Sequence, residues 1–383
     1  MVQLRFPRIT TTTLLLALAA AAGSCGKDAT GPGAVVLTTV SNGGGHSCGL
    51  TATGAAYCWG LNSYGQLGNG STANSSTPVA VSAGLTFATL VSGYYHTCAI
   101  TTAGATYCWG DGADGELGNG STIVSTTPVL VSGGLTLVTV SSRFEHTCGL
   151  TALGTAYCWG NGFNGQLGNG VHALSSTPVS VSGGLTFKAV TSGFYHSCGL
   201  TTAGAVYCWG SNATGQLGNF TLLSSDTPVA LGGGLTFSTL GAGFSHSCGL
   251  SGTVAYCWGY NDYGQLGDGR NTDSTGPVRV AGGITFKSVS AGIAHSCGVS
   301  ADNAAFCWGY DLSGQLGDGT INTRTTPVAV AGRLGFALIA AGGGHTCGVT
   351  TEGVAYCWGL NSYGQLGNGT TTNSNVPVRV SLP

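Results

Sequence analysis

Residues 46–70 read HSCGLTATGAAYCWGLNSYGQLGNG, and variants of this stretch recur along the rest of the chain. Each copy begins at a histidine, and successive copies begin 50, 50, 50, 50, 49 and 50 residues apart: His46, His96, His146, His196, His246, His295 and His345. A period near 50 residues, with short runs of Val, Thr and Ser between Gly-rich turns, is typical of β-propeller blades. Helical repeats would need an apolar period of 3.6 residues, and these units do not have one.

Four candidate strands can be read in each unit. In the second unit they are residues 78–81 (PVAV), 87–91, 96–100 and 105–109. The repeats begin with VVLTTV at 35–40, which matches the second of these strands, and end with PVRV at 377–380, which matches the first. The sequence therefore predicts an all-β, seven-bladed β-propeller of four-stranded blades over residues 35–383. We expect the C-terminal strand to close the ring by joining the first blade, which would remove an open sheet edge.

The cysteines follow the repeat. Of the 15 in the chain, all but Cys25 form one pair per unit. Placing Cys48 opposite Cys58 leaves a three-residue loop with Gly54 third, where a hairpin of this length needs a left-handed residue. The shorter fifth unit instead centres on Gly252-Thr253, as a two-residue turn with Gly first requires. The register predicts these disulfides: Cys48–Cys58, Cys98–Cys108, Cys148–Cys158, Cys198–Cys208, Cys248–Cys257, Cys297–Cys307 and Cys347–Cys357. Metal binding by His and Cys is the alternative, but the close Cys spacing typical of zinc sites is missing.

The N-terminal residues indicate export. Arg5 and Arg8 precede a short apolar stretch, and small residues lead to Cys25, as in a bacterial lipoprotein signal. We predict a signal peptide over 1–25, with Cys25 lipidated as the mature N-terminus, and a flexible tether over 26–34. An ordinary cleaved signal peptide is the alternative. Lipidation would explain why Cys25 has no partner in the repeat.

Composition narrows the function. Only 6% of residues are charged, the formal net charge is -2, and 11 Lys and Arg are spread over the whole chain, which argues against nucleic acid as a partner. The Gly-rich segments belong to turns and contain no phosphate-binding or dinucleotide-binding motif. A histidine present in every unit is best explained by a shared structural hydrogen bond. We therefore predict no catalytic residues, no metal and no cofactor.

The motif GxxHSCGLT…AYCWGxNxYGQLGNG resembles the repeat of the regulator of chromosome condensation family, and the resemblance covers residues 35–383. Members of that family form seven-bladed propellers, and they include an exchange factor for the GTPase Ran, a plant ultraviolet-B photoreceptor and a secreted bacterial inhibitor of β-lactamases. The resemblance implies the fold and leaves the activity open. The secreted relative implies binding of a protein through loops on one face. The paired cysteines are not part of the general family pattern.

Function is better sought where the repeats differ, and the two positions before each histidine differ most. Four consecutive units carry aromatic residues there, whereas the first and last units carry glycines. Equivalent positions lie at one end of the ring, so we predict one binding face made of Tyr94, Tyr95, Phe144, Glu145, Phe194, Tyr195 and Phe244. A second variable loop follows each Trp-Gly, and the sequence does not decide whether it shares this face. The alternative is that part of the aromatic set packs between blades.

These observations favour an exported, lipid-anchored, monomeric scaffold that binds a protein or a glycan. It would lie in the bacterial cell envelope, at the outer membrane or cell surface, or be secreted if Cys25 is not lipidated. The only membrane contact expected is the N-terminal lipid. Two alternatives stay open: a polysaccharide-acting lyase or hydrolase, which would need paired carboxylates or a metal at one end of the channel, and a purely structural envelope protein.

Overall fold

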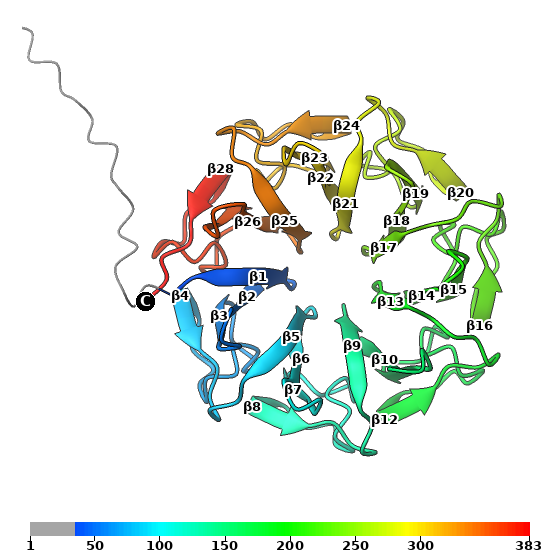
Figure 1. Ribbon diagram of the computed structural model, residues 1–383, viewed down its shortest axis with the longest axis horizontal. Helices are drawn as coiled ribbons and strands as arrows, with labels where there is room; N and C mark the ends of the chain where they lie inside the picture. Colours follow the sequence, from blue (N-terminus) through cyan, green and yellow to red (C-terminus); the bar gives the residue numbers. More distant parts are fainter. Residues whose placement is uncertain (1–34) are drawn as a thin grey trace, which may run out of the picture. The chain divides into compact units, whose positions relative to one another are not determined.

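The computed structural model describes residues 35–383, which form seven four-stranded antiparallel sheets arranged in a ring (Figure 1). These residues contain strands and turns and no helix, so no helix among them is able to cross a membrane. The prediction of a seven-bladed β-propeller is confirmed. The predicted signal peptide, Cys25 and the tether lie outside the described residues.

Each blade runs from an inner strand at the channel to an outer strand at the rim. The inner strands are β1 (Leu37–Asn42), β5 (Phe87–Ser92), β9 (Leu137–Ser142), β13 (Ala189–Ser192), β17 (Thr239–Ala242), β21 (Phe286–Ala291) and β25 (Phe336–Ala341). The second strands are β2 (His46–Thr51), β6 (His96–Thr101), β10 (His146–Thr151), β14 (His196–Leu200), β18 (His246–Ser251), β22 (His295–Ser300) and β26 (His345–Thr350).

The third strands are β3 (Ala56–Gly60), β7 (Thr106–Gly110), β11 (Ala156–Gly160), β15 (Val206–Gly210), β19 (Val254–Gly259), β23 (Ala305–Gly309) and β27 (Ala355–Gly359). The outer strands are β4 (Ser75–Ala80), β8 (Ser125–Leu130), β12 (Ser175–Ser180), β16 (Ser225–Ala230), β20 (Ser274–Arg279), β24 (Arg324–Ala329) and β28 (Ser374–Arg379). Blades 1 to 7 are numbered in this order.

The predicted closure of the ring by the C-terminal strand is wrong. Strand β28 pairs with β27 of its own blade, and β4 likewise pairs with β3, so every blade is continuous in sequence. The Pro-Val segment thus belongs to the outer strand that ends a blade. Pro78 is tolerated in β4 because an edge strand does not need every N–H donor for pairing. Counting strand segments could not decide whether the Pro-Val strand begins a blade or ends one, because both assignments give seven complete four-stranded blades.

Loops and side-chain packing close the ring instead. The loop that follows the third strand of each blade reaches the outer strand of the next, as where Gly70 N donates to Thr126 O at 2.9 Å. The same bond joins blade 7 to blade 1, from Gly369 N to Ser76 O at 2.9 Å. Asn42 in β1 also donates through Nδ2 to Ala340 O in β25 at 2.7 Å. The closing junction therefore repeats the geometry of the others.

The hairpin between the second and third strands places the cysteines as predicted. Cys48 pairs with Cys58 in the register, and Gly54 at the third loop position has a φ of 81°. In blade 5, Ser251 pairs directly with Val254, which leaves the predicted two-residue turn. All seven disulfides form, with Cα atoms 4.0–4.1 Å apart. Disulfides at this density are typical of proteins in an oxidising environment.

The hydrophobic core lies between blades, with one cluster at each junction. Trp109 of blade 2 is fully buried among Leu50 and Leu67 of blade 1 and the Cys48–Cys58 bridge. Trp59 fills the same place against blade 7, beside Val349 and Leu366. Since burying an aromatic side chain contributes about 2–3 kcal/mol, these junctions are a main source of stability.

Candidate binding face

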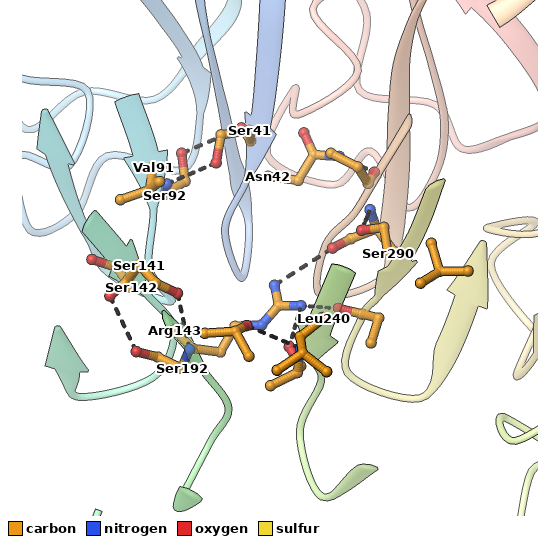
Figure 2. A pocket seen from close by; sticks show the side chains of 17 residues that line it. Ser41, Asn42, Val91, Ser92, Ser141, Ser142, Arg143, Ser192, Leu240 and Ser290 are labelled. Carbon is orange, nitrogen blue, oxygen red and sulfur yellow. Dashed lines mark hydrogen bonds between the residues drawn. The ribbon is translucent and has the colours of Figure 1, made fainter. Parts of the chain in front are cut away.

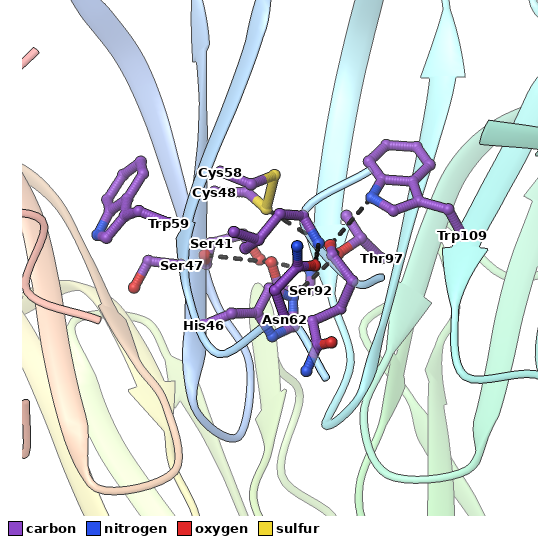
Figure 3. Close-up of a disulfide and its surroundings, with 12 residues drawn as sticks. Ser41, His46, Ser47, Cys48, Cys58, Trp59, Asn62, Ser92, Thr97 and Trp109 are labelled. Atoms are coloured by element: carbon purple, nitrogen blue, oxygen red, sulfur yellow. Dashed lines mark hydrogen bonds between the residues drawn. A yellow bond between two sulfur atoms is a disulfide. The ribbon is translucent and has the colours of Figure 1, made fainter. Parts of the chain in front are cut away.

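The repeated histidines belong to the blade junctions. His46 Nε2 lies 2.9 Å from Thr97 Oγ1 of the next blade, and Thr97 donates to Gln66 O, which also accepts from Trp109 Nε1 (Figure 3). Because the Thr97 proton is used on Gln66 O, the histidine must donate through Nε2. The pattern recurs around the ring and closes with His345 on Ser47 Oγ at 2.8 Å.

Burial lowers the pKa of each of these histidines to about 3, so they are neutral at ordinary pH. Their Nδ1 atoms face no partner within residues 35–383, and a proton placed there would be buried without an acceptor. The histidines therefore hold neighbouring blades together. This agrees with the structural assignment made from sequence.

The predicted aromatic residues lie together at one end of the channel. The ring of Phe144 stacks on that of Phe194 with centroids 3.4 Å apart, and Phe194 lies 3.8 Å from Phe244. Tyr94 meets Phe144 edge to face at 5.2 Å. We call these four residues the aromatic arc. They contact one another along the channel mouth, and Phe194 at its centre is only 7% exposed.

Tyr95 and Tyr195 lie on the outer side of the aromatic arc. The Tyr95 ring is 4.5 Å from that of Tyr94, and the Tyr195 ring is 4.3 Å from that of Phe194. Both tyrosines are half-buried. Desolvation raises the pKa of Tyr95 to about 12 and also raises that of Tyr195, so both keep their hydroxyl protons. Their rings, each with a neutral hydroxyl group, thus lie against the apolar rings of the aromatic arc.

The second variable loop shares this face, which the sequence left undecided. Tyr64 follows the third strand of blade 1, and its ring lies 4.9 Å from that of Tyr95 in blade 2. In the next repeat, Asp114 takes the place of Tyr64 and Glu145 that of Tyr95. Both kinds of loop leave the sheets at the same end of the ring, which we call the aromatic face.

An acidic junction lies beside the aromatic arc, between blades 2 and 3. Asn161 Nδ2 donates both to Asp114 Oδ1 and to Glu145 Oε2, each at 3.1 Å. Desolvation, with Asp114 and Asp111 nearby, raises the pKa of Glu145 to about 7. Desolvation also raises the pKa of Asp114. The predicted face residue Glu145 thus belongs to a carboxylate pair in which the pKa of both members is raised.

Two residues of this region were missed by the sequence reasoning. Glu116 stands where the other repeats have Gln; it is 2% exposed, and burial raises its pKa to about 8. Arg143 stands where the other repeats have Gly, three positions before the histidine. Comparing the repeats position by position would have found both, because each is the only departure at its place.

Charge is divided between the two ends of the ring. Most carboxylates of residues 35–383 lie in the loops and strand ends of the aromatic face: Asp111, Asp114, Glu116, Glu145, Asp226, Asp262, Asp268, Asp273, Asp311 and Asp318. The opposite face carries mostly cations, namely Lys188, Arg279, Lys287, Arg333 and Arg379, with Asp302 and Glu352. The small net charge of the chain hides this separation, which gives each face its own electrostatic character.

Across residues 35–383, no group of three or more His, Cys, Asp or Glu side chains could hold a metal ion. The cysteines are used in disulfides and the repeated histidines in the junctions. The chemical groups left on the aromatic face are its aromatic rings, tyrosine hydroxyls and carboxylates, together with His172, Arg270 and Arg324.

A ring of seven blades with uniform junctions and one variable face defines a propeller-type binding scaffold. Comparison with known families places it more narrowly. The RCC1-like domain matches residues 138–383, and the regulator of chromosome condensation (RCC1) repeat matches residues 53–100 and 103–150, with a second model of that repeat matching 38–66. The chain belongs to the RCC1 repeat family.

Solved structures agree on the fold. Human WBSCR16 superposes with a TM-score of 0.78 at 22% identity, covering 86% of this chain and 94% of that one. Prp20p from Saccharomyces cerevisiae, described with its binding to Gsp1p and histones, gives 0.75 at 22% identity, covering 91% and 87%. The ectodomain of the Arabidopsis thaliana receptor kinase ACR4 gives 0.56 at 22%, covering 91% and 100%. No curated protein matches the sequence.

Proposed function

We propose that this propeller is an exported binding scaffold that holds a protein partner on its aromatic face. The observation that carries the proposal is the unequal distribution of aromatic residues in an otherwise uniform ring. They stand in four consecutive blades, contact one another, and lie next to Tyr95 and Tyr195. Clustered tyrosines beside an apolar centre are a common composition of protein interfaces.

Charge complementarity indicates the character of the partner. The aromatic face carries most of the carboxylates, and Asp114 and Glu145 lie directly beside the aromatic arc. A partner surface with Lys or Arg would neutralise these groups, and its cations could also stack on exposed tyrosine rings. We therefore propose a basic partner surface. Association should weaken as salt rises, because the attraction is screened.

The test is cross-linking of the intact protein in the envelope of its host, comparing a Tyr95→Ala/Tyr195→Ala variant with the parent. Capture of the partner should fall at least tenfold. A matched control is Leu153→Ala, which removes a side chain that is 84% exposed in a hairpin of the opposite face. Equal capture by all three proteins would sink the proposal.

The acidic junction adds a pH test. A basic partner favours the ionised carboxylate, and the pKa of Glu145 is about 7, so binding should tighten between pH 6 and pH 8. The groups that face Glu145 are Asp111, Asp114, Asn161 and Tyr195. Glu145→Gln should reduce this pH dependence without affecting the aromatic contacts. A partner that binds more tightly at pH 6 would contradict the basic-surface assignment.

Export and lipid anchoring form the second part of the proposal. The proposal is supported by the short apolar stretch that follows Arg5 and Arg8, by Cys25 as the one cysteine outside the repeat, and by the seven disulfides of residues 35–383. Mass spectrometry of the mature protein should find a diacylated N-terminal cysteine at position 25 and no free thiol. Cys25→Ala should release the protein from membranes, and unchanged membrane association of this variant would overturn the anchor.

The polysaccharide-acting alternative has one observation in its favour. Asp114 and Glu145 form a carboxylate pair, and the raised pKa of Glu145 suits a general acid. Polysaccharide cleavage that is abolished in Glu145→Gln would establish it. A glycan that binds and is released intact would instead place the sugar among the ligands of the scaffold.

A further inference from the structure

The central channel contains a polar cavity of about 200 Å³, lined by the seven inner strands (Figure 2). Its lining is mostly Ser, Thr, Ala and Val, and Arg143 is the one charged residue among the residues that line it. The share of liquid volume taken by one water is about 30 Å³, so the cavity has room for a small ion with part of its hydration shell.

Arg143 crosses the channel instead of pointing into solvent. From blade 3 its guanidinium reaches carbonyl oxygens of three distant blades: Ala242 at 3.2 Å, Ala341 at 3.5 Å, and Ala291 (Figure 2). A guanidinium has five N–H donors, so these three bonds leave two of them for another acceptor. The other repeats have glycine here, and the long cationic side chain is an addition to the basic fold.

The charge of Arg143 is not balanced by a carboxylate. Arg143 forms no ion pair within residues 35–383, and no Asp or Glu lines the cavity. Burial lowers the pKa of Arg143 to about 10, which still leaves it charged at neutral pH. A buried cation solvated only by carbonyl dipoles is costly, and an anion beside it would recover part of that cost.

Hydroxyl groups supply further donors around the same cavity. Each of four hydroxyl oxygens accepts a backbone N–H from the neighbouring inner strand, as in the pair Ser92 N to Ser41 Oγ at 2.8 Å. In the same way, Ser141 Oγ accepts from Ser192 N at 2.9 Å. Thr191 Oγ1 accepts from Ala242 N at 3.1 Å, and Ser290 Oγ accepts from Ala341 N at 3.0 Å. Because each oxygen is occupied as an acceptor and donates to no group of residues 35–383, its proton is available to a guest.

The two ends of the channel differ in a way that favours entry of an anion from the face opposite the aromatic arc. At the aromatic end, Tyr94, Ile293 and Arg143 surround a space of only about 10 Å³. The opposite face carries five of the eight Lys and Arg residues of 35–383: Lys188, Arg279, Lys287, Arg333 and Arg379. A positive face around one mouth of a channel raises the local concentration of anions there.

We propose that the central channel binds a small anion, an inorganic oxyanion or a carboxylate, held by the Arg143 guanidinium and the free hydroxyl protons of Ser41, Ser141, Thr191 and Ser290. The anion neutralises the one buried charge of the channel and ties the guanidinium of blade 3 to the inner strands around it. This inference does not depend on the partner proposed for the aromatic face.

The experiment is thermal unfolding and calorimetric titration of the intact protein with inorganic phosphate and with acetate, at constant ionic strength balanced by sodium chloride. Either anion should bind and raise the melting temperature. Arg143→Gly, which installs the residue found in the other repeats, should weaken that binding at least tenfold, and Arg143→Lys should retain part of it. Tyr95→Ala/Tyr195→Ala should bind the anion like the parent, which separates this test from that of the aromatic face.

Two further variants keep the test decisive. Arg333→Gln removes a cation from the opposite face outside the cavity and should change the affinity less than twofold. Ser141→Ala/Ser290→Ala keeps the charge and removes two hydroxyls, and it should weaken binding three- to tenfold even if Arg143→Gly does not fold. The proposal is overturned if neither anion binds the parent, if the hydroxyl variant binds unchanged, or if Arg333→Gln loses as much as Arg143→Gly.

Discussion

The blade junctions and the aromatic face obey opposite rules. At the junctions, His, Ser or Thr, Gln or Glu, and Trp recur with nearly identical hydrogen bonds in every blade. On the aromatic face, the corresponding loop positions change from glycine in blades 1 and 7 to stacked aromatics in blades 2 to 5. A ring needs equal junctions to close, whereas a binding site for one partner needs unequal residues. Departures from the repeat therefore mark the candidate functional residues.

The largest effect that distinguishes the two regions should come from acid. The junction histidines have a pKa of about 3 when folded and 6.5 when unfolded, so below pH 6.5 the unfolded chain binds more protons. Their contribution to stability is complete above pH 6.5 and is lost as pH falls toward 3. At pH 5 the loss is about 2 kcal/mol per histidine, or on the order of 10 kcal/mol for the ring. Urea unfolding at pH 7.5 and pH 5 measures it, and unchanged stability would contradict the junction assignment.

Glu116 should have the next largest effect, with the opposite sign. Its folded pKa of about 8 lies above the unfolded value of 4.5, so stability is lost as pH rises from 4.5 through 8. Glu116→Gln restores the residue of the other repeats and should stabilise the protein by about 3 kcal/mol at pH 7, with little effect at pH 4. The reciprocal control is Gln66→Glu in blade 1, which should destabilise at pH 7. A pH-independent difference would rule out a buried carboxyl as the cause.

The disulfides come third. Each closes a hairpin with a sequence separation of 9 or 10 residues, for which the chain-entropy model gives at most about 3 kcal/mol. Replacing Cys98 and Cys108 together by Ala should therefore lower the free energy of unfolding by about 2–3 kcal/mol. The same double replacement in blade 5 is the control for position in the ring. Loss of folding from one such pair would mean that the bridges do more than restrict the unfolded chain.

The smallest effect on stability is expected on the aromatic face. Tyr95→Ala and Tyr195→Ala remove half-buried rings from loops, so each should cost less than about 1 kcal/mol. Trp109→Ala at a junction should cost about 3–5 kcal/mol, because it leaves a cavity in the core. Thermal unfolding of the three variants gives the contrast directly. Equal losses of stability would show that Tyr95 and Tyr195 also support the ring.

Much of the fold follows from local sequence rules. The 50-residue period predicts the number of blades, and the loop lengths at Gly54 and Gly252 predict which cysteines face each other. The aromatic residues before the histidines were correctly expected to share one end of the ring. The assignment of the Pro-Val strand failed, since a strand's hydrogen-bonding partner is a tertiary property that a periodic sequence leaves ambiguous.

The sequence by itself determined the seven four-stranded blades, the disulfide pairing and the one set of positions at which the blades differ. These depend on short-range spacing, which β-strand alternation and hairpin geometry translate directly into structure. Only the tertiary structure decided how the ring closes, that both variable loops share the aromatic face, that the charges separate between the two faces, and that Arg143 spans the channel. These depend on which residues of distant blades meet, and closing the chain into a ring is what brings them together.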